Sequence, residues 1–166
     1  FGHEAVLGPH RYREMLDAGV NVCLGTDSII NVPHQQADRL SVLDDMRLIK
    51  DSHEITLMRR AAEIASQAHA RAMRFARPGQ FEYEVEAEIA HEFIRFGART
   101  PAYNHIVASG PNACVLHYND SNRKMQDGDM LLIDAGCEYA GYASDITRTF
   151  PVNGKFTGPQ RDVYQA

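Results

Sequence analysis

The sequence predicts an α/β (α+β) fold in which helices pack against strands. Two stretches, residues 51–76 and 83–96, carry apolar residues at helical spacing. The apolar run 130–133 and the stretch 141–150 that follows it are typical of strands. Residues 9–28 show the order helix, strand and acid-bearing loop, which is the order of an α/β unit.

The N-terminal stretch ends in an acidic loop. Pro9 is favoured as the first residue of a helix, and Gly19 as its stop. The β-branched strand 20–24 then leads to Asp27. Ligands of α/β units bind at the carboxyl ends of strands, and Asp27 stands just past such an end. The other interpretation is that Asp27 forms a turn or caps a helix.

The two central helices have recognisable ends. Asp51 is expected to cap the first helix, with Glu54 completing a capping box, and Pro78 to stop it. Small residues dominate the stripe of this helix that is expected to approach a sheet: Ile55, Met58, Ala62, Ala65, Ala72 and Ala76. In the second helix we expect these residues to be buried: Val85, Ile89, Phe93 and Phe96. We expect these to face water: Glu82, Glu84, Glu86, Glu88 and Arg95.

A loop that contains a histidine follows the strand predicted over residues 102–109. His117 comes after an apolar triplet and before the polar residues 118–122, a pattern typical of a loop that faces a cleft. A structural role is the other interpretation of this single histidine. A tight turn at 127–129 then leads into the next strand, and we expect residues 101–150 to form one antiparallel-rich sheet covered by both helices.

Asp134 stands at the end of an apolar strand. The run 130–133 is typical of a strand buried on both faces. An ionised carboxylate is not stable alone in such a place, because its desolvation is costly, so it needs a proton, a cation or a metal ion. For Asp134 taken alone, an ion pair with Arg148 or a turn at 135–136 is the alternative.

A second acid gives Asp134 a neighbour. Asp145 follows a Gly-containing reversal at 138–141, so a hairpin would bring the two carboxylates within about 8 Å of each other, given strands ~4.8 Å apart. Two close carboxylates repel, and a divalent cation relieves the repulsion. Hard oxygen ligands suit Mn, Co or Zn acting on water, so the pair predicts a hydrolytic metal site.

The composition limits the functions to consider. A chain of 166 residues, 44% hydrophobic and 23% charged, fits one domain with a core. The formal charge of −5, without a Lys/Arg run, argues against nucleic acid and membrane surfaces and favours small-molecule or peptide substrates. No apolar stretch approaches ~18 residues, and no signal peptide is recognised. Cys23, Cys114 and Cys137 are odd in number and widely spaced, so we expect no disulfide framework and a cytoplasmic location.

Three long motifs carry a resemblance to a known family. Residues 106–118 (IVASGPNACVLHY), 127–136 (DGDMLLIDAG) and 141–155 (GYASDITRTFPVNGK) resemble the Xaa-Pro aminopeptidase (aminopeptidase P) branch of the metallopeptidases related to methionine aminopeptidase and prolidase. The resemblance covers about residues 46–166. It implies the pita-bread α/β fold and removal of an N-terminal residue that precedes proline in a peptide. It also implies two divalent metal ions, with Mn expected first and Co or Zn as alternatives.

The same resemblance implies roles for four residues. Asp134 would be the bidentate ligand of one ion, and Asp145 would bridge both ions. His117 would contact the substrate or stabilise the tetrahedral intermediate, and Thr147 would support the ligands with its hydroxyl. In the family, one His and two Glu ligands and a further catalytic His follow later than residue 166. We therefore expect this chain alone to bind metal weakly and to lack activity.

The N-terminal segment resembles a different family. Residues 17–28 (DAGVNVCLGTDS) and 40–47 (LSVLDDMR) resemble the end of the barrel in amidohydrolases, with guanine deaminase and chlorohydrolase-like branches closest. The resemblance implies that Asp27 is a metal ligand. We therefore expect residues 1–47 to be an amidohydrolase-like fragment and residues 48–166 to be the N-terminal half of a pita-bread catalytic domain, so that the chain is a composite of two enzyme fragments.

Three functions stay open on the sequence alone. The first is a dinuclear-metal Xaa-Pro aminopeptidase whose partner is a peptide with proline at its second position. The second is an amidohydrolase-type deaminase with Asp27 as ligand. The third is a catalytically silent half-domain that serves folding or interaction. The sequence also leaves a homo-oligomer open, because a missing half would leave strand edges unpaired.

Overall fold

Helix α3 (Ser52–Phe75) begins at the predicted cap in this computed structural model, which describes residues 45–166. Asp51 accepts hydrogen bonds from the backbone N–H groups of His53 and Glu54 at 2.8 and 2.9 Å, and the Glu54 carboxylate accepts from the Asp51 N–H at 2.7 Å. The predicted capping box is confirmed. Helix α4 (Glu82–Arg95) agrees with the predicted second helix to within one residue at each end.

The buried stripe of α3 differs in part from the prediction. Its fully buried small residues are Ala61, Ala65, Ala68 and Ala72, followed by Ala76 after the helix. Ile55 and Met58, which were expected on this stripe, keep 38% and 37% of their surface exposed. Ala62, also expected there, is exposed. Periodicity alone therefore placed the later part of the stripe, Ala65 to Ala76, correctly and its first part, Ile55 to Ala62, wrongly.

Six short strands follow the helices. They are β1 (Thr100–Pro101), β2 (Ile106–Ser109), β3 (Met130–Ala135), β4 (Cys137–Tyr139), β5 (Tyr142–Ala143) and β6 (Ile146–Pro151). They form two antiparallel sheets, with strand orders β1-β4-β5 and β2-β3-β6, so the expectation of one sheet is wrong. Only the second half of the strand predicted over 102–109 forms, because residues 102–105 connect the two sheets.

A single hairpin runs through both sheets. Ala135 pairs with Ile146 in one sheet, and Glu138 pairs with Ala143 in the other, so the same register continues across the gap at Gly136. Ala140 (φ 51°) and Gly141 (φ 84°) both lie in the left-handed region, as a two-residue type I′ turn requires. The predicted reversal at 138–141 is confirmed.

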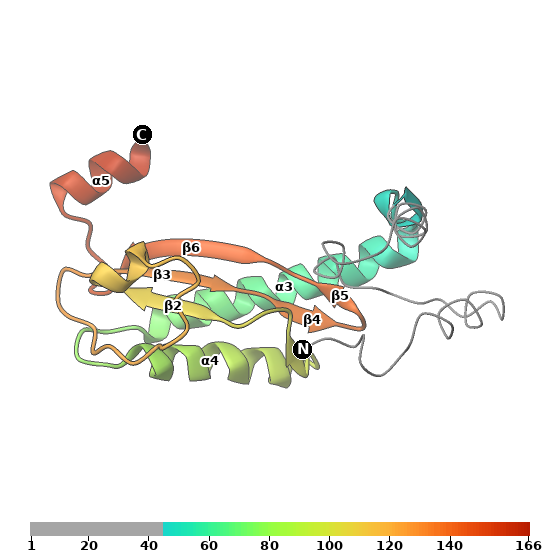
Figure 1. Cartoon of the computed structure of the whole chain (residues 1–166), viewed down its shortest axis with the longest axis horizontal. Coiled ribbons are helices and arrows are strands. Elements are labelled where there is room, and N and C mark those ends of the chain that lie inside the picture. Colours follow the sequence, from blue (N-terminus) through green and yellow to red (C-terminus); the bar gives the residue numbers. More distant parts are fainter. Residues whose placement is uncertain (1–44) are drawn as a thin grey trace, which may run out of the picture. The chain divides into compact units, whose positions relative to one another are not determined.

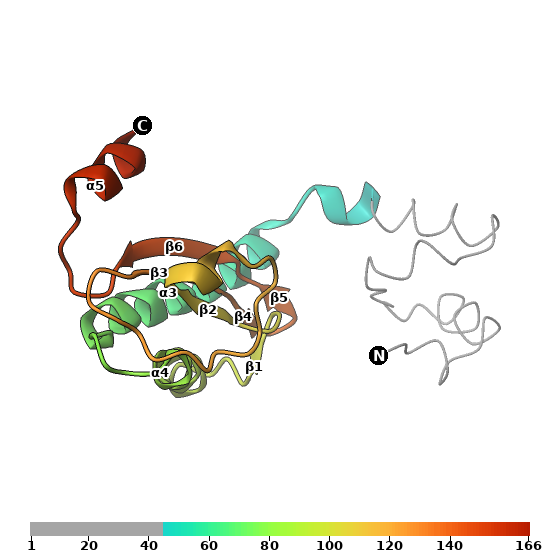
Figure 2. The same cartoon turned by 60° about the vertical axis from the view of Figure 1, so that its left-hand side comes forward.

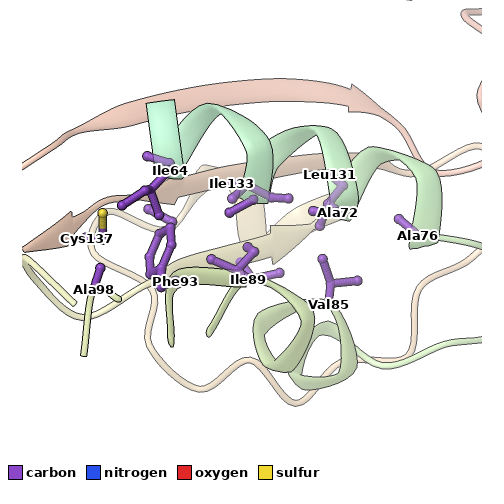
Figure 3. Packing of buried hydrophobic residues seen from close by; sticks show 14 of the residues in the cluster. Ile64, Ala72, Ala76, Val85, Ile89, Phe93, Ala98, Leu131, Ile133 and Cys137 are labelled. Carbon is purple, nitrogen blue, oxygen red and sulfur yellow. The ribbon is translucent and has the colours of Figure 1, made fainter. Parts of the chain in front are cut away.

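Helices α3 and α4 lie side by side and cover one face of the sheet β2-β3-β6 (Figure 1). Ile64 of α3, Phe93 of α4 and Ile133 of β3 belong to one buried cluster between the helices and the sheet (Figure 3). Along β3, Leu131, Ile133 and Ala135 are fully buried, whereas the alternate residues Met130, Leu132 and Asp134 are half-buried. The expectation that this strand is buried on both faces is therefore wrong, and Asp134 lies on the face that the helices do not cover.

Glu82 is the exception among the four acids of α4 that were expected to face water. It was expected to face water, but it is fully buried and accepts hydrogen bonds from several donors. Phe96, expected to be buried, is partly buried against the core. The acidic spacing of α4 could not separate Glu82 from Glu84 or Glu86, because its donors come from distant parts of the chain.

The remaining described elements are short. The 3-10 helix η3 (Gly110–Cys114) follows β2, and α5 (Gly158–Gln165) extends away from the sheets (Figure 2). Residues 45–48 are helical, and Asp51–Ala166 form one compact unit. The predicted helix 9–18, the strand 20–24 and Asp27 lie outside the described residues. No helix in residues 45–166 is long and apolar enough to cross a membrane.

Candidate metal centre

Asp134 and Asp145 lie on the same face of the hairpin. Asp134 of β3 is the register partner of Thr147 in β6, and Asp145 stands two positions before Thr147. Side chains two residues apart on a strand share a face, so the two acids are diagonal neighbours across the strands. The turn at Ala140-Gly141 and the alternation of the strands fix this arrangement.

One hydroxyl group joins the two carboxylates. The Tyr103 hydroxyl lies within hydrogen-bond distance of Asp134 Oδ1 at 2.6 Å and of Asp145 Oδ1 at 2.8 Å. The two carboxylate oxygens therefore lie no farther apart than the sum of these distances, well inside the expected limit of about 8 Å. The hairpin brings the two acids together as predicted, whereas their role as metal ligands stays a prediction.

Tyr103 keeps its proton at this position. Burial raises its pKa far above the ordinary value of 10.0, and hydrogen bonds to Asp134 and Asp145 raise the pKa further. A neutral hydroxyl supplies one proton for two acceptors, so it can shield two ionised carboxylates only in part. Remaining negative charge on neighbouring oxygens favours the binding of a cation.

Gly136 allows Tyr103 to reach this position. A Cβ atom at residue 136 would stand 1.7 Å from the backbone oxygen of Ser144 and 3.0 Å from Cε1 of the Tyr103 ring. Any side chain there would push the two strands, or the ring, apart. The backbone also holds this approach, because the Ala102 N–H donates to the Gly136 carbonyl at 2.9 Å. Gly136 is thus a close-approach residue of the site.

The alternative partners of Asp134 are not used. Arg148 is the register partner of Ile133, one position out of step with Asp134, and its guanidinium donates to the Thr147 carbonyl at 2.7 Å. Residues 135–136 continue the hairpin ladder instead of forming a turn at Asp134. The carboxylate of Asp134 is therefore oriented by Tyr103 alone among these candidates.

His117 occupies an exposed loop after η3. Its backbone lies in the left-handed region with φ 52°, and its neighbour Tyr118 is 7% exposed. No hydrogen bond within residues 45–166 joins His117 to Asp134 or Asp145. The structure thus brings together Asp134, Asp145 and Thr147 and leaves the imidazole of His117 open to solvent. Its predicted contact with substrate stays a prediction.

The residues present fit part of a divalent metal site. Two carboxylates with neighbouring oxygens are hard donors of the kind that Mn²⁺ accepts. Such ions need ~4–6 donors, and residues 45–166 hold no cluster of three or more His, Cys, Asp or Glu side chains that could bind a metal. The described residues therefore offer two carboxylate side chains for such a site and no third His, Cys, Asp or Glu beside them.

Sequence reasoning missed Tyr103. The residue fell within the stretch predicted as a strand, whereas the chain bends there between β1 and β2. Its contacts span 31 and 42 positions of the sequence, so no local pattern could reveal them. The pair of acids on one hairpin was the only local signal of the site.

The family follows from comparison with known sequences. Residues 56–166 match the profile described as metallopeptidase family M24. The chain belongs to metallopeptidase family M24. Among curated relatives of this M24 chain, the Xaa-Pro aminopeptidase of Escherichia coli K12 is 56% identical over 140 residues, 84% of this chain and 32% of the relative. The Xaa-Pro aminopeptidase of Haemophilus influenzae is 58% identical over 124 residues, 75% of this chain and 29% of the relative.

Solved structures give the same family for this M24 chain. The zinc-substituted aminopeptidase P of E. coli in complex with product is 62% identical with a TM-score of 0.71, covering 72% of this chain and 27% of that one. Proline aminopeptidase P II from Yersinia pestis is 47% identical with a TM-score of 0.76, covering 95% of this chain and 37% of that one. The fold is mixed α/β, and its structural neighbours are aminopeptidases P.

The chain spans about a third of the length of the curated relatives it matches. The alignment with the E. coli relative covers 140 residues of this M24 chain, so it extends N-terminal of Met46. Likeness to aminopeptidases is therefore not confined to the residues after the expected join. The amidohydrolase resemblance of residues 1–47, and the division of the chain at residue 48, stay predictions.

Proposed function

We propose that this chain is part of a metal-dependent aminopeptidase that removes an N-terminal residue preceding proline. The observation that carries the proposal is the pair Asp134 and Asp145, held within reach of one hydroxyl in a chain of family M24. Relatives at 56% and 58% identity named Xaa-Pro aminopeptidase support the substrate class, a peptide with proline at its second position.

Asp134 and Asp145 would hold the divalent ions, for which Mn is our first choice and Co or Zn the alternatives. Divalent ions of this kind, when bound, activate water and polarise the scissile carbonyl. Tyr103 orients both carboxylates before any ion arrives, and Thr147, opposite Asp134, would support them. The exposed imidazole of His117 would contact the substrate or stabilise charge that develops on its carbonyl oxygen.

Residues 48–166 would then be the N-terminal half of a pita-bread catalytic domain. The coverage of about a third of each relative supports this division, as does the supply of only two metal donors by the described residues. Two donors bind an ion weakly and leave most of its coordination to water. We therefore expect calorimetry with Mn²⁺ on the 166-residue chain to give a dissociation constant above about 1 μM; a tighter site would contradict this.

The proposal also concerns location and the alternative activities. Cys114 and Cys137 are free thiols, which supports a reducing, cytoplasmic environment. For the amidohydrolase-type deaminase, the single candidate ligand is Asp27, which lies outside the described residues. No described feature favours that activity or a silent half-domain over the aminopeptidase.

The test uses a protein in which both halves of the domain are present. Residues 51–166 of this chain replace the matched segment of the E. coli relative, and we call this protein the completed enzyme. We expect it to release alanine from an Ala-Pro peptide in a Mn²⁺-dependent reaction, and to leave an Ala-Ala peptide and guanine unchanged. Cleavage of the Ala-Ala peptide as fast as the Ala-Pro peptide would contradict the proposed specificity for proline. No cleavage of the Ala-Pro peptide would reject the proposed function.

A further inference from the structure

The first residue of α4, Glu82, is a buried carboxylate with five hydrogen-bond donors. Its oxygens accept from Ser109 N at 2.6 Å, Ser109 Oγ at 2.7 Å, Tyr118 OH at 2.8 Å, Arg123 N at 3.0 Å and Asn112 Nδ2 at 3.3 Å. Glu82 is 0% exposed. Burial of a carboxylate is costly unless donors replace its water, and five donors at the start of a helix do so.

These donors stand on both sides of His117. Asn112 comes before it in the chain, and Tyr118 and Arg123 come after it. Glu82 therefore ties together the two ends of the segment 112–123, which we call the His117 loop.

The same carboxylate connects the His117 loop to the metal centre. Ser109 ends β2, and the other end of that strand, Ile106, is the register partner of Asp134. Arg123 adds a second connection, since its guanidinium donates to Ser109 Oγ at 2.8 Å and to Asp129 Oδ2 at 2.5 Å, just before β3. The loop is thereby fixed against the two strands that carry and flank Asp134.

The backbone of the His117 loop needs such support. His117 and Ser121 have φ values of 52° and 44°, in the left-handed region that costs free energy for residues other than glycine. Strained conformations of this kind persist only where surrounding contacts over-determine them, and they concentrate at functional sites. Tyr118 provides one such contact directly after His117, and burial, followed by its hydrogen bond to Glu82, raises the pKa of this tyrosine, so its hydroxyl stays a donor.

We propose that Glu82 is a positioning residue, which holds the His117 loop so that the imidazole of His117 faces a substrate at the Asp134–Asp145 site. Its effect on catalysis rests on the proposed function, whereas its effect on the loop does not. Only an ionised carboxylate accepts all five bonds, because an amide at this position would replace one acceptor oxygen by a donor group.

The kinetic test compares two buried carboxylates of α4 in the completed enzyme. For Glu82→Gln we expect kcat on the Ala-Pro peptide to fall roughly 10- to 100-fold with little change in KM, because small displacements of a reacting group have effects of this size. Glu92→Gln is the matched control, since Glu92 is 6% exposed on the same helix but its partners are Arg71, His91 and Arg95. Its kcat should stay near that of the parent.

A double-mutant cycle separates positioning from general damage. In the His117→Ala background, Glu82→Gln should lower kcat no further, because its effect passes through the imidazole. Tyr118→Phe removes one of the five hydrogen bonds and should give a smaller fall of the same kind. Equal losses for Glu82→Gln and Glu92→Gln, or additive losses in the His117→Ala background, would overturn the proposal.

Hydrogen exchange gives a readout that does not depend on activity. Amides of residues 112–123 in the 166-residue chain and in the completed enzyme should exchange at least about tenfold faster in Glu82→Gln and remain unchanged in Glu92→Gln. If the completed enzyme does not cleave Xaa-Pro peptides, the proposed function fails, and exchange still decides the role of Glu82 in the loop. Unchanged exchange in Glu82→Gln would overturn the inference even in an active enzyme.

Discussion

Glu82 is fully buried and accepts hydrogen bonds from five donor groups, whereas Asp134 and Asp145 lie on the uncovered face of a hairpin and share one hydroxyl. The first carboxylate is satisfied by the chain itself and has no capacity left for a ligand. The carboxylates of Asp134 and Asp145, by contrast, keep unshielded negative charge on neighbouring oxygens. The difference separates a carboxylate that organises the fold from carboxylates that are available for chemistry, although all three belong to one small unit.

The largest expected effect concerns the pair Asp134 and Asp145. Asp134→Asn and Asp145→Asn, each in the completed enzyme, should lower kcat/KM for the Ala-Pro peptide by about 10³-fold or more, since a metal ion supplies several kcal/mol of transition-state stabilisation. The melting temperature should change little, because neither carboxylate is buried alone. Asp127 is an exposed acid that accepts a hydrogen bond from Asn153. Asp127→Asn is the control and should keep full activity. Activity that survives both substitutions would contradict the comparison.

The next largest effect concerns the buried carboxylate of Glu82. Glu82→Ala should lower the free energy of unfolding of the 166-residue chain by about 3 kcal/mol, because it leaves buried donors without an acceptor. Urea denaturation followed by circular dichroism measures this change. Glu63→Ala on the exposed face of α3 should stay within about 0.5 kcal/mol of the parent. A loss below about 1 kcal/mol for Glu82→Ala would show that water replaces its carboxylate.

A smaller effect sharpens the contrast between the two sites. Tyr103→Phe removes the shared hydroxyl and should destabilise the chain by about 1 kcal/mol at neutral pH, because the two carboxylates then repel without a donor between them. Millimolar Mn²⁺ should recover much of this loss and none of the loss caused by Glu82→Ala. Urea denaturation with and without Mn²⁺ measures the free energy of unfolding of both variants. If Mn²⁺ stabilises Tyr103→Phe and Glu82→Ala equally, or neither of them, the result would count against a cation site at Asp134 and Asp145.

The smallest effect concerns a buried group without a partner. His105 is 9% exposed, and its Nε2 atom has no hydrogen-bond partner among the described residues. Burial lowers the pKa of His105 below the usual 6.5; the charge of Glu86 opposes this shift, and His69 adds to it. Below pH 6.5 the unfolded chain binds more protons than the folded chain, so stability should fall as the pH drops from 6.5 through the lowered pKa. His105→Asn should flatten this slope in urea denaturation between pH 7 and about pH 5.

Local signals in the sequence predicted part of the fold and part of the candidate metal centre. The capping box at Asp51 and the reversal at 138–141 depend on residues a few positions apart, and both were predicted correctly. Asp134 and Asp145 were paired correctly from one hairpin, although the reason given for Asp134, burial on both faces of its strand, was wrong. Strand alternation was hidden because the half-buried face of β3 also carries Met130 and Leu132.

The missed residues depend on contacts between distant segments. Glu82 meets donors 27 to 41 positions away, and Tyr103 reaches the acids across 31 and 42 positions. A glutamate in an acidic run and a tyrosine in a stretch predicted as a strand carry no local sign of such partners. The break between the two sheets was missed for the same reason, since in the bend at 102–105 the Tyr103 ring lies close to Gly136, 33 positions away.

The continuous hairpin also has a consequence for the order of events during folding. Asp134 and Asp145 belong to strands joined by the two-residue turn Ala140-Gly141, so their mutual geometry depends on a short loop closure. Hairpins of this kind form in about 1–10 μs, whereas contacts between remote segments form more slowly. The two carboxylates can therefore acquire their spacing while the polypeptide is still being synthesised, and later segments meet two acidic side chains that already lie side by side.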